Sequence, residues 1–366
     1  MARPFILGLV NDLAFEHHLT SPQGHRRELR GASTAEVGGF QCGDRVRFSV
    51  TLDGERVGGA AFDAHGCGAA TAAGSAAVAL VRGHPVIDAA RVGTHEIAEE
   101  LGGLSAPKLH AAELASDALA RALGKAARAR AALRKPSGGR TLVAMSGGVD
   151  SAVAALLSSR ARETVTVTLE LWSDRDTDAE RSCCSASAVA QARKLAHSMD
   201  LPHFTIDLRE EFRSGVVEPF IAGYAAGETP NPCVGCNGHV RLDAMLELAE
   251  QLGCEALATG HYARVVADSE GPLLRAATDA AKDQTYMLAA LAPESLQRMR
   301  FPLGELTKPE VREIAAEADL PVAHKLDSQD LCFLAGTDRA RFLARHGRLE
   351  LRARAGRLPE RASERV

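Results

Sequence analysis

Six residues, SGGVDS at positions 146–151, join two apolar runs and have the composition of a phosphate-binding turn. Residues 141–144 before them are apolar, as in a buried strand, and residues 152–157 after them are apolar and alanine-rich, as in a buried helix. Glycine permits close approach of another group, and the free N–H groups of the helix start point into the turn. The stretch predicts a phosphate site; the alternative is a glycine-rich helix start without a ligand.

Three cysteines have a pattern that suits sulfur chemistry. Cys233 and Cys236 form a C-x-x-C in GETPNPCVGCN (227–237), whose prolines and glycines predict a rigid, non-helical loop, and Cys332 lies in HKLDSQDLCFL (324–334). Such a pair is a redox couple, half a metal site or a sulfur-transfer site, and the absence of a second C-x-x-C disfavours a four-cysteine zinc site. Replacing a carbonyl oxygen by sulfur needs one thiol to deliver sulfur and another to resolve the mixed disulfide.

The elements around these residues predict two domains, 1–134 and 135–366, joined by a basic and then Pro-Ser-Gly-Gly linker. In the second, strands at 141–144, 164–171, 203–207 and 256–260 alternate with helices that include 152–160 and 186–199, which predicts a parallel, doubly wound α/β sheet with ligands at its carboxyl edge. The first domain is predicted to have an α+β fold, with a hairpin that turns at Asp53-Gly54 and helices at 69–82, 94–103 and 110–135.

Composition limits the functional classes. The chain has 366 residues, 46% hydrophobic and 25% charged, with a net charge of −4, so we expect a globular protein without an overall nucleic-acid signature. No apolar run approaches the roughly 20 residues of a membrane span, and no signal peptide is evident, so we expect a cytoplasmic protein without membrane contact. Eight cysteines in such a chain indicate catalysis, metal binding or burial rather than structural disulfides.

The loop lacks the lysine of the Gly-Lys-Ser/Thr nucleotide loop and the third glycine of the dinucleotide turn, and it resembles the PP-loop of ATP pyrophosphatases. The resemblance implies ATP cleavage between the α- and β-phosphates and leaves amidation and thiolation open. Asp150 would cap the helix or help to place Mg²⁺. The nucleotide set that it implies in the loop and before it is Ala144, Met145, Ser146, Gly147, Gly148, Val149, Asp150 and Ser151.

A series of motifs, found in this order along the chain, narrows the choice of reaction. The motifs are AMSGGVDS, LELW, RSCCS, EPFIAGYAAGETPNPCVGCN, ATGHYAR, KDQTYML and DSQDLCFL. Over residues 140–345 the chain resembles the bacterial tRNA-specific 2-thiouridylases, which have a PP-loop fold of the adenine nucleotide alpha hydrolase type. The resemblance implies ATP-dependent 2-thiolation of the wobble uridine in tRNAs of the Lys, Glu and Gln type. It also implies release of AMP and pyrophosphate, and sulfur supplied by a cysteine desulfurase or a sulfur carrier.

The same resemblance assigns roles to residues. Cys236 corresponds to the nucleophile and Cys332 to the persulfide-bearing cysteine. Positions that border the ATP adenine or ribose are Leu169 and Gly260; positions that meet tRNA or its target base are Asn231, Pro232, Cys233, His261, Lys282, Asp283 and Gln284. Many family members lack a cysteine at the position of Cys233. Because this chain has one, the three thiolates of Cys233, Cys236 and Cys332 could instead hold a [4Fe-4S] cluster with one open iron. The persulfide and cluster routes both remain open.

The first domain resembles the U-type (NifU/IscU-like) iron–sulfur scaffold proteins in GGFQCGDRVRFSV, DAHGCGAATAAGSAAVALVRGH and EELGGLSAPKLHAAELASDALARAL. The implied ligands are Cys42, Asp44 and Cys67, with His110 beside Ala111, which stands where the family has its third cysteine. We expect a module that delivers sulfur or a cluster to the fused enzyme at high local concentration. The alternative is a degenerate domain kept for folding or tRNA docking.

The sequence is also compatible with two other functions. The chain could be an iron–sulfur carrier with a non-functional or truncated thiolase half, since the family continues into a further domain and a β-barrel that we expect to be absent here. It could also be a PP-loop partner of an amidotransferase, against which the cysteine motifs argue. Two further residues, Cys254 and Trp172, are expected to be packed in the core.

Overall fold

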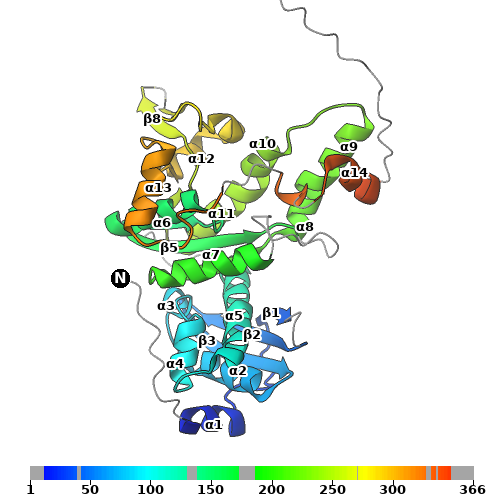
Figure 1. Cartoon of the computed structure of the whole chain (residues 1–366), viewed down its shortest axis with the longest axis vertical. Coiled ribbons are helices and arrows are strands. Elements are labelled where there is room, and N and C mark those ends of the chain that lie inside the picture. Colours follow the sequence, from blue (N-terminus) through cyan, green and yellow to red (C-terminus); the bar gives the residue numbers. More distant parts are fainter. Residues whose placement is uncertain are drawn as a thin grey trace, which may run out of the picture.

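The computed structural model describes residues 12–38, 43–129, 138–172, 186–269, 271–326, 331–334 and 337–347. They form two units stacked along the long axis of the molecule, with the N-terminal unit below the larger second unit in Figure 1. The predicted boundary between residues 134 and 135 lies outside the described residues, so its position stays a prediction.

A three-stranded antiparallel sheet in the order β1-β2-β3 is the base of the N-terminal unit. Buried and more exposed residues alternate along β2, as in a strand with one face on a core. The predicted hairpin is confirmed, but its two-residue loop is Gly54-Glu55, one position later than predicted, with Gly54 at φ 59°. The strands are β1 (Ser33–Gly38), β2 (Arg45–Asp53) and β3 (Arg56–His65).

Helices cover this sheet, and the predicted helices at 69–82, 94–103 and 110–135 correspond to α2, α4 and α5. Most of α2 is buried, because its alanines let it pack closely on β3 and α5. The helices are α1 (Asp12–Thr20), α2 (Gly68–Val81), α3 (Val86–Ala89), α4 (Thr94–Glu100), the 3₁₀ turn η1 (Ala106–Lys108) and α5 (Leu109–Ala129).

The second unit contains a five-stranded sheet in the order β10-β7-β4-β5-β6, with every pair parallel, as the alternating pattern predicted. The sequence did not predict the short edge strand β10 or the separate hairpin of β8 and β9. The strands are β4 (Arg140–Ala144), β5 (Glu163–Glu170), β6 (His203–Asp207), β7 (Ala256–Ala258), β8 (Arg264–Asp268), β9 (Gly271–Arg275) and β10 (Met299–Arg300).

Helices flank this sheet on both faces. Next to β4, Val143 packs in a cluster with α6, α7 and α13, whereas Leu142 belongs to the cluster that contains α11 and α5. The helices are α6 (Val149–Ala161), α7 (Ala186–Ser198), α8 (Arg209–Phe212), η2 (Arg213–Val217), α9 (Glu218–Ala225), α10 (Pro232–Cys236), η3 (Asn237–Arg241), α11 (Leu242–Gln251), η4 (Thr285–Leu288), α12 (Pro293–Arg298), α13 (Lys308–Glu317), η5 (Cys332–Leu334) and α14 (Arg339–Gly347). None of the helices that the structure describes is long and apolar enough to cross a membrane.

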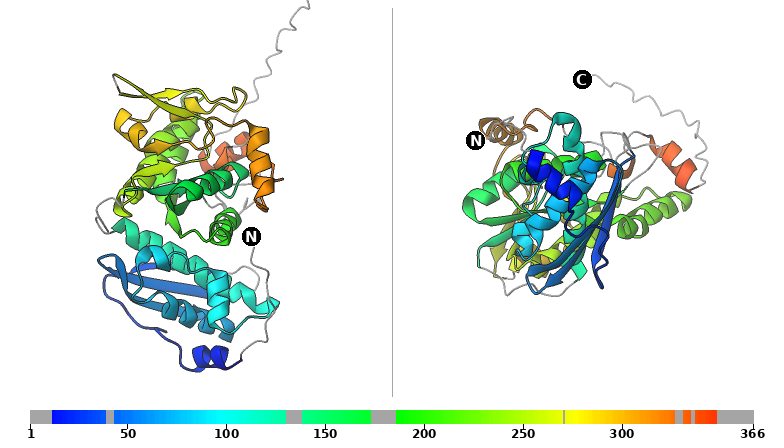
Figure 2. Two further views of the ribbon diagram at one scale, coloured as in Figure 1. Left: turned by 90° about the vertical axis from the view of Figure 1, so that its left-hand side faces the viewer. Right: turned by 90° about the horizontal axis from the view of Figure 1, so that it is seen from below.

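The two units share one hydrophobic core. Side chains of the first sheet and of α5 belong to the same buried cluster as Phe204 and Ile206 of β6. Figure 2 shows α5 lying between the blue sheet of the N-terminal unit and the green elements of the second unit. The N-terminal unit therefore packs against the second sheet, and the linker is not their sole connection.

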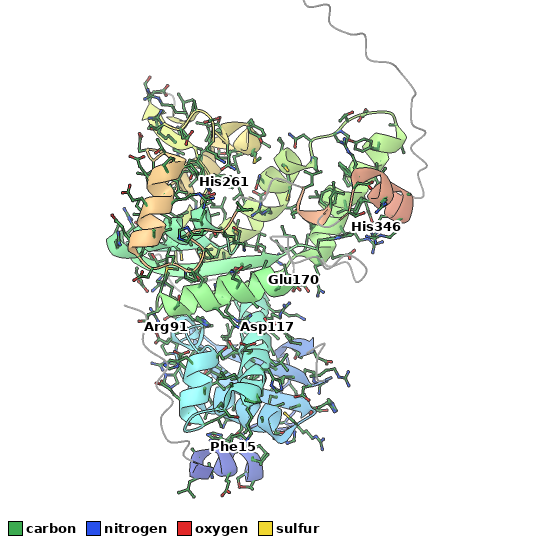
Figure 3. All side chains as sticks on the ribbon, viewed as in Figure 1. Phe15, Arg91, Asp117, Glu170, His261 and His346 are labelled. Carbon is green, nitrogen blue, oxygen red and sulfur yellow. The ribbon has the colours of Figure 1, made fainter. Side chains whose placement is uncertain are left out.

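A buried polar network adds specificity to this interface. Asp117 of α5 accepts hydrogen bonds from Arg121 and from Arg193 of α7, and Arg121 also pairs with Glu170 at the end of β5 (Figure 3). Burial alone would raise the pKa of Asp117, but the two guanidinium groups beside it hold that pKa below its usual value. The carboxylate is therefore charged and paired where the two units meet.

Candidate functional site

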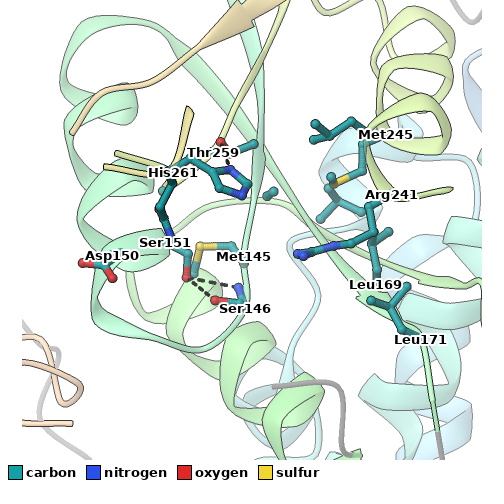
Figure 4. Close-up of a pocket in the computed structure, with 15 residues that line it drawn as sticks. Met145, Ser146, Asp150, Ser151, Leu169, Leu171, Arg241, Met245, Thr259 and His261 are labelled. Carbon is teal, nitrogen blue, oxygen red and sulfur yellow. Dashed lines mark hydrogen bonds between the residues drawn. The ribbon is translucent and has the colours of Figure 1, made fainter. Parts of the chain in front are cut away.

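One pocket opens at the carboxyl edge of the parallel sheet, where the sequence predicted a ligand (Figure 4). The ends of β4, β5 and β7 and the start of α6 and α11 contribute its walls. The lining residues are Ala144, Met145, Ser146, Asp150, Ser151, Val167, Leu169, Leu171, Arg241, Leu242, Met245, Thr259, Gly260, His261 and Gln284. Nine of the predicted site residues thus surround one space.

The predicted phosphate loop is folded by its own side chains. The Ser151 hydroxyl accepts the Ser146 N–H at 3.1 Å and lies 3.1 Å from the Ser146 hydroxyl, so the ends of the loop are tied together. Gly147 adopts φ 70°, and Gly148 is the N-cap of α6 with no side chain capping it. The first N–H groups of α6 therefore face the loop, which is the arrangement that binds phosphate oxygens.

The prediction that Asp150 caps the helix is wrong, because its carboxylate lies in a different set of contacts. Lys308 of α13 donates to both carboxylate oxygens at 2.7 and 2.8 Å, and the Tyr262 hydroxyl donates to one of them at 3.0 Å. The Lys308 side chain is only 10% exposed. Asp150 therefore anchors a buried ammonium group next to the loop, and neither Lys308 nor Tyr262 was singled out from the sequence.

Gly260 and His261 follow β7 and lie against the phosphate loop. A Cβ on Gly260 would come within 2.8 Å of the Ser151 nitrogen, so only glycine allows this approach. The His261 Nδ1 lies 2.8 Å from the Thr259 hydroxyl. Burial, and secondarily the charge of Arg241, lower the pKa of His261 to about 3, so its imidazole is neutral at physiological pH.

The predicted tRNA residues Lys282, Asp283 and Gln284 do not share one environment. The Gln284 side chain accepts the Tyr262 N–H at 3.0 Å and lines the pocket. Asp283 accepts hydrogen bonds from Ala277 N–H and from the Thr285 hydroxyl, so it holds its own loop together. Contact of these residues with tRNA stays a prediction.

The C-x-x-C motif is helical, which corrects the predicted non-helical loop. Asn231 is the N-cap of α10 and accepts the Cys233 N–H at 3.1 Å, while Pro232 occupies the first helical turn, where its missing N–H costs nothing. The same run continues through η3 into α11. Cys236 is 6% exposed and faces the core, whereas Cys233 is half-buried.

Cys332 starts η5 and is half-buried beside the same core. The next residue, Phe333, packs edge-on against Phe212 and Phe220 of the arm that α8, η2 and α9 form. Trp172 packs against Phe212 and belongs to the same aromatic cluster, which confirms its predicted packing role. Because α10 also contacts this arm through η2, both cysteine segments rest on it.

The other cysteines divide into a buried thiol and a candidate ligand. Cys254 is buried, which confirms its predicted place in the core, and burial raises the pKa of its thiol to about 12. Cys42, Cys183 and Cys184 lie outside the described residues. Cys67, in the N-terminal unit, is exposed.

Three predicted scaffold ligands meet in the N-terminal unit. The Cys67 Sγ and the His110 Nε2 lie 3.1 and 3.2 Å from the same Asp44 oxygen. Ligand atoms of these three residues lie within 4.8 Å of one another, the one such set of three among the described residues. Thiolate, imidazole and carboxylate are ligands that suit zinc and iron. Ala111, beside His110, is fully buried.

Comparison with known proteins agrees with this architecture. The family model described as "tRNA methyl transferase HUP domain" matches residues 139–336, and "NifU-like N terminal domain" matches residues 15–132. The first match covers more than half of the chain. The chain belongs to the tRNA methyl transferase HUP domain family. Within that family it carries a NifU-like domain in front, which confirms both resemblances found in the sequence.

One relative has a name that joins both domains, and another matches a smaller share of the chain. The "Bifunctional protein NifU/MnmA" of Rubrobacter xylanophilus is 46% identical over 87% of this chain and 66% of its own length. A "tRNA-specific 2-thiouridylase MnmA" of Sorangium cellulosum is 47% identical over 59% of this chain and 57% of its own length. The chain thus spans about three-fifths of the length of these two HUP-domain relatives. Among solved structures, the "U34-tRNA thiolase NcsA" of Methanococcus maripaludis has 17% identity and a TM-score of 0.34 over 58% of this chain and 66% of that chain, a similarity too low to bear on function.

Proposed function

We propose that this chain catalyses ATP-dependent 2-thiolation of the wobble uridine of tRNA. The observation that carries the proposal is the pocket, in which a PP-loop, three strand ends and the helical run that begins with the C-x-x-C motif border one space. An activating nucleotide and a sulfur-handling cysteine are what thiolation of a carbonyl requires. Its similarity to proteins named tRNA-specific 2-thiouridylase supports this substrate.

The activation step uses the loop. The free N–H groups at the start of α6 and the hydroxyls of Ser146 and Ser151 would hold the phosphates of ATP. Uridine O2 attacks the α-phosphorus, and pyrophosphate leaves. Preorganised donors around the phosphates lower this barrier because they need no reorganisation as charge moves. The neutral imidazole of His261 adds no competing charge.

Sulfur transfer uses the cysteines. In the persulfide route the terminal sulfur of a Cys332 persulfide attacks C2, AMP leaves with the former O2, and the Cys236 thiolate attacks the remaining Cys332 sulfur. This step releases the thiolated base and forms a disulfide between the two cysteines, which an external dithiol reduces. A cysteine desulfurase or a sulfur carrier would reload Cys332.

Two inorganic groups were expected from the sequence, and their fit differs. Mg²⁺ at Asp150 does not fit, because Lys308 and Tyr262 already occupy that carboxylate, and we derive no step through it. Thiolates are the ligands that iron–sulfur clusters take, so Cys233, Cys236 and Cys332 fit a [4Fe-4S] cluster by type. Such a cluster would present a sulfide in place of the persulfide sulfur. The persulfide and cluster routes are alternatives within the same proposal.

The test is thiolation in a defined mixture. Unmodified tRNA, ATP, and a desulfurase with cysteine should give 2-thiouridine, detected by mercury-affinity gel shift, with one AMP released per modified base. Cys236→Ala and Cys332→Ala should abolish the product. AMP formation that instead depends on glutamine or ammonia and survives both substitutions would reject thiolation in favour of amidation.

A second function is favoured by the ligand set Asp44, Cys67 and His110, which supports a role as an iron–sulfur or sulfur carrier. Under this alternative, protein reconstituted with iron and sulfide transfers its cluster to an unrelated apoprotein and cleaves no ATP. Delivery from this set to the fused catalytic unit joins the two functions, and loss of thiolation in Cys67→Ala under limiting sulfur would support that joint role.

A further inference from the structure

One arginine stands in the wall of the pocket opposite the phosphate loop. Arg241 ends η3, in the same helical run as Cys236, and lines the pocket with Leu242 and Met245 of α11. It is the sole lysine or arginine among the described residues that line this pocket. An anion bound in the pocket therefore meets this guanidinium from that wall.

The place of Arg241 in the pocket is specific. Figure 4 shows its guanidinium reaching across the space toward Met145 and Ser146, while Leu169 and Leu171 lie on its own side. The charge thus stands between an apolar wall and the loop that supplies backbone donors. The leucines would contact the base of a bound nucleotide, and the loop would bind its terminal phosphates. The guanidinium therefore lies level with the part of the nucleotide between the base and the terminal phosphates.

We propose that Arg241 binds the α-phosphate of the adenine nucleotide, an inference that rests on the proposed use of ATP. Guanidinium presents paired N–H donors that match two phosphate oxygens. The α-phosphate is present in ATP, in the adenylated uridine and in AMP, so Arg241 keeps its partner after pyrophosphate has left.

This assignment also links the two half-reactions. Cys236 and Arg241 belong to one continuous helical run, so the contact that orients the α-phosphate also sets the position of the cysteine. The Asn237 side chain, between them in sequence, lies 3.5 Å from an Arg241 nitrogen. Arg241 lies four residues beyond the quoted motif around the C-x-x-C, and the sequence alone did not show that it faces the nucleotide pocket.

The experiment compares three ligands by isothermal titration calorimetry with the full chain: adenosine, AMP and ATP. In Arg241→Gln, AMP and ATP should each bind roughly tenfold or more weakly, since a hydrogen bond to a charged group is lost. Adenosine, which lacks the phosphate, should bind within twofold of wild type. Arg241→Lys should recover part of the loss. The matched control is Arg298→Gln, a half-buried arginine on α12 that contacts α11 away from the pocket and should change nothing.

Each other outcome overturns the assignment. Unchanged AMP and ATP binding in Arg241→Gln would exclude the α-phosphate contact. Equal losses for adenosine and AMP would mean that the arginine only shapes the pocket. If wild-type protein binds neither ATP nor AMP, the proposed function itself fails, which is distinguishable because it needs no variant.

Discussion

Gly124 of α5 lies directly against the backbone carbonyl of Thr205 in β6, and a Cβ at Gly124 would collide with that oxygen. The contact joins a helix of the NifU-like unit to the edge strand of the five-stranded parallel sheet. Glycine inside a helix costs about 1 kcal/mol relative to alanine, so its presence in the middle of α5 needs a reason. The close approach of the two units supplies that reason.

We therefore expect Gly124→Ala to destabilise the protein, although alanine favours helix. The clash should cost about 1–3 kcal/mol, as overpacking does in a well-packed interior. Urea unfolding followed by circular dichroism measures this change. A variant at least as stable as wild type would show that the two units are not docked through α5 as described.

The sequence predicted some features of this molecule and could not predict others, for physical reasons. Strand–turn–helix patterning and the SGGVDS loop are local, so the parallel sheet and the position of the loop between β4 and α6 could be inferred from them. The helix at 232–236 was missed because prolines suggested a loop, whereas Asn231 and Pro232 act as a helix start. The partner of Asp150 could not be inferred, because Lys308 is distant in the chain and only the tertiary fold brings the two together.

The interface histidines make stability depend on pH. Burial first, and then the charge of Arg193, lower the pKa of His197 to about 4; Arg91 lowers it further, while Asp200 and the Ala90 carbonyl oppose the shift. Burial also lowers the pKa of His203 well below its usual value. Below pH about 6.5 the unfolded chain binds these protons and the folded chain does not, so stability falls as the pH falls from 6.5 toward 4.

Each such imidazole contributes a slope of about 1.4 kcal/mol per pH unit in that window. Unfolding free energies measured at several pH values should show the decline, and His197→Gln should reduce its slope by about 1.4 kcal/mol per pH unit, while His203 still contributes. His84→Gln, at an exposed position, serves as control and should leave the slope unchanged. A pH-independent stability between 4 and 6.5 would contradict the burial of these rings.

The Lys308–Asp150 pair should behave as a coupled unit. Lys308→Met leaves a partly buried carboxylate without its ammonium partner and should cost about 1–3 kcal/mol, less than a fully buried pair because Asp150 is one-third exposed. The double variant with Asp150→Asn should cost less than the sum of the single changes. Urea denaturation of the four proteins measures the coupling, and additive costs would mean that the pair contributes nothing.

The Asp44, Cys67 and His110 set should bind a divalent metal in the full chain. Titration with Co²⁺ should give the absorption bands of a thiolate-bound ion, and His110→Ala should weaken binding by roughly tenfold or more, as loss of metal-site residues does. His95→Ala, an exposed histidine paired with Glu99, is the matched control. Equal Co²⁺ affinity in His110→Ala and in wild type would remove His110 from the site.

Cys233 distinguishes the two sulfur routes. If three thiolates hold a cluster, anaerobic reconstitution with iron and sulfide gives a broad absorption near the visible range that Cys233→Ala lacks, and thiolation of tRNA is lost with it. If the persulfide route operates, Cys233→Ala thiolates tRNA as wild type does when a desulfurase supplies sulfur. Cys42→Ala is run in parallel, because a cluster in the N-terminal unit would absorb in the same range. A cluster that survives Cys233→Ala but not Cys42→Ala therefore belongs to the NifU-like unit, and half-buried Cys233 is then not a cluster ligand.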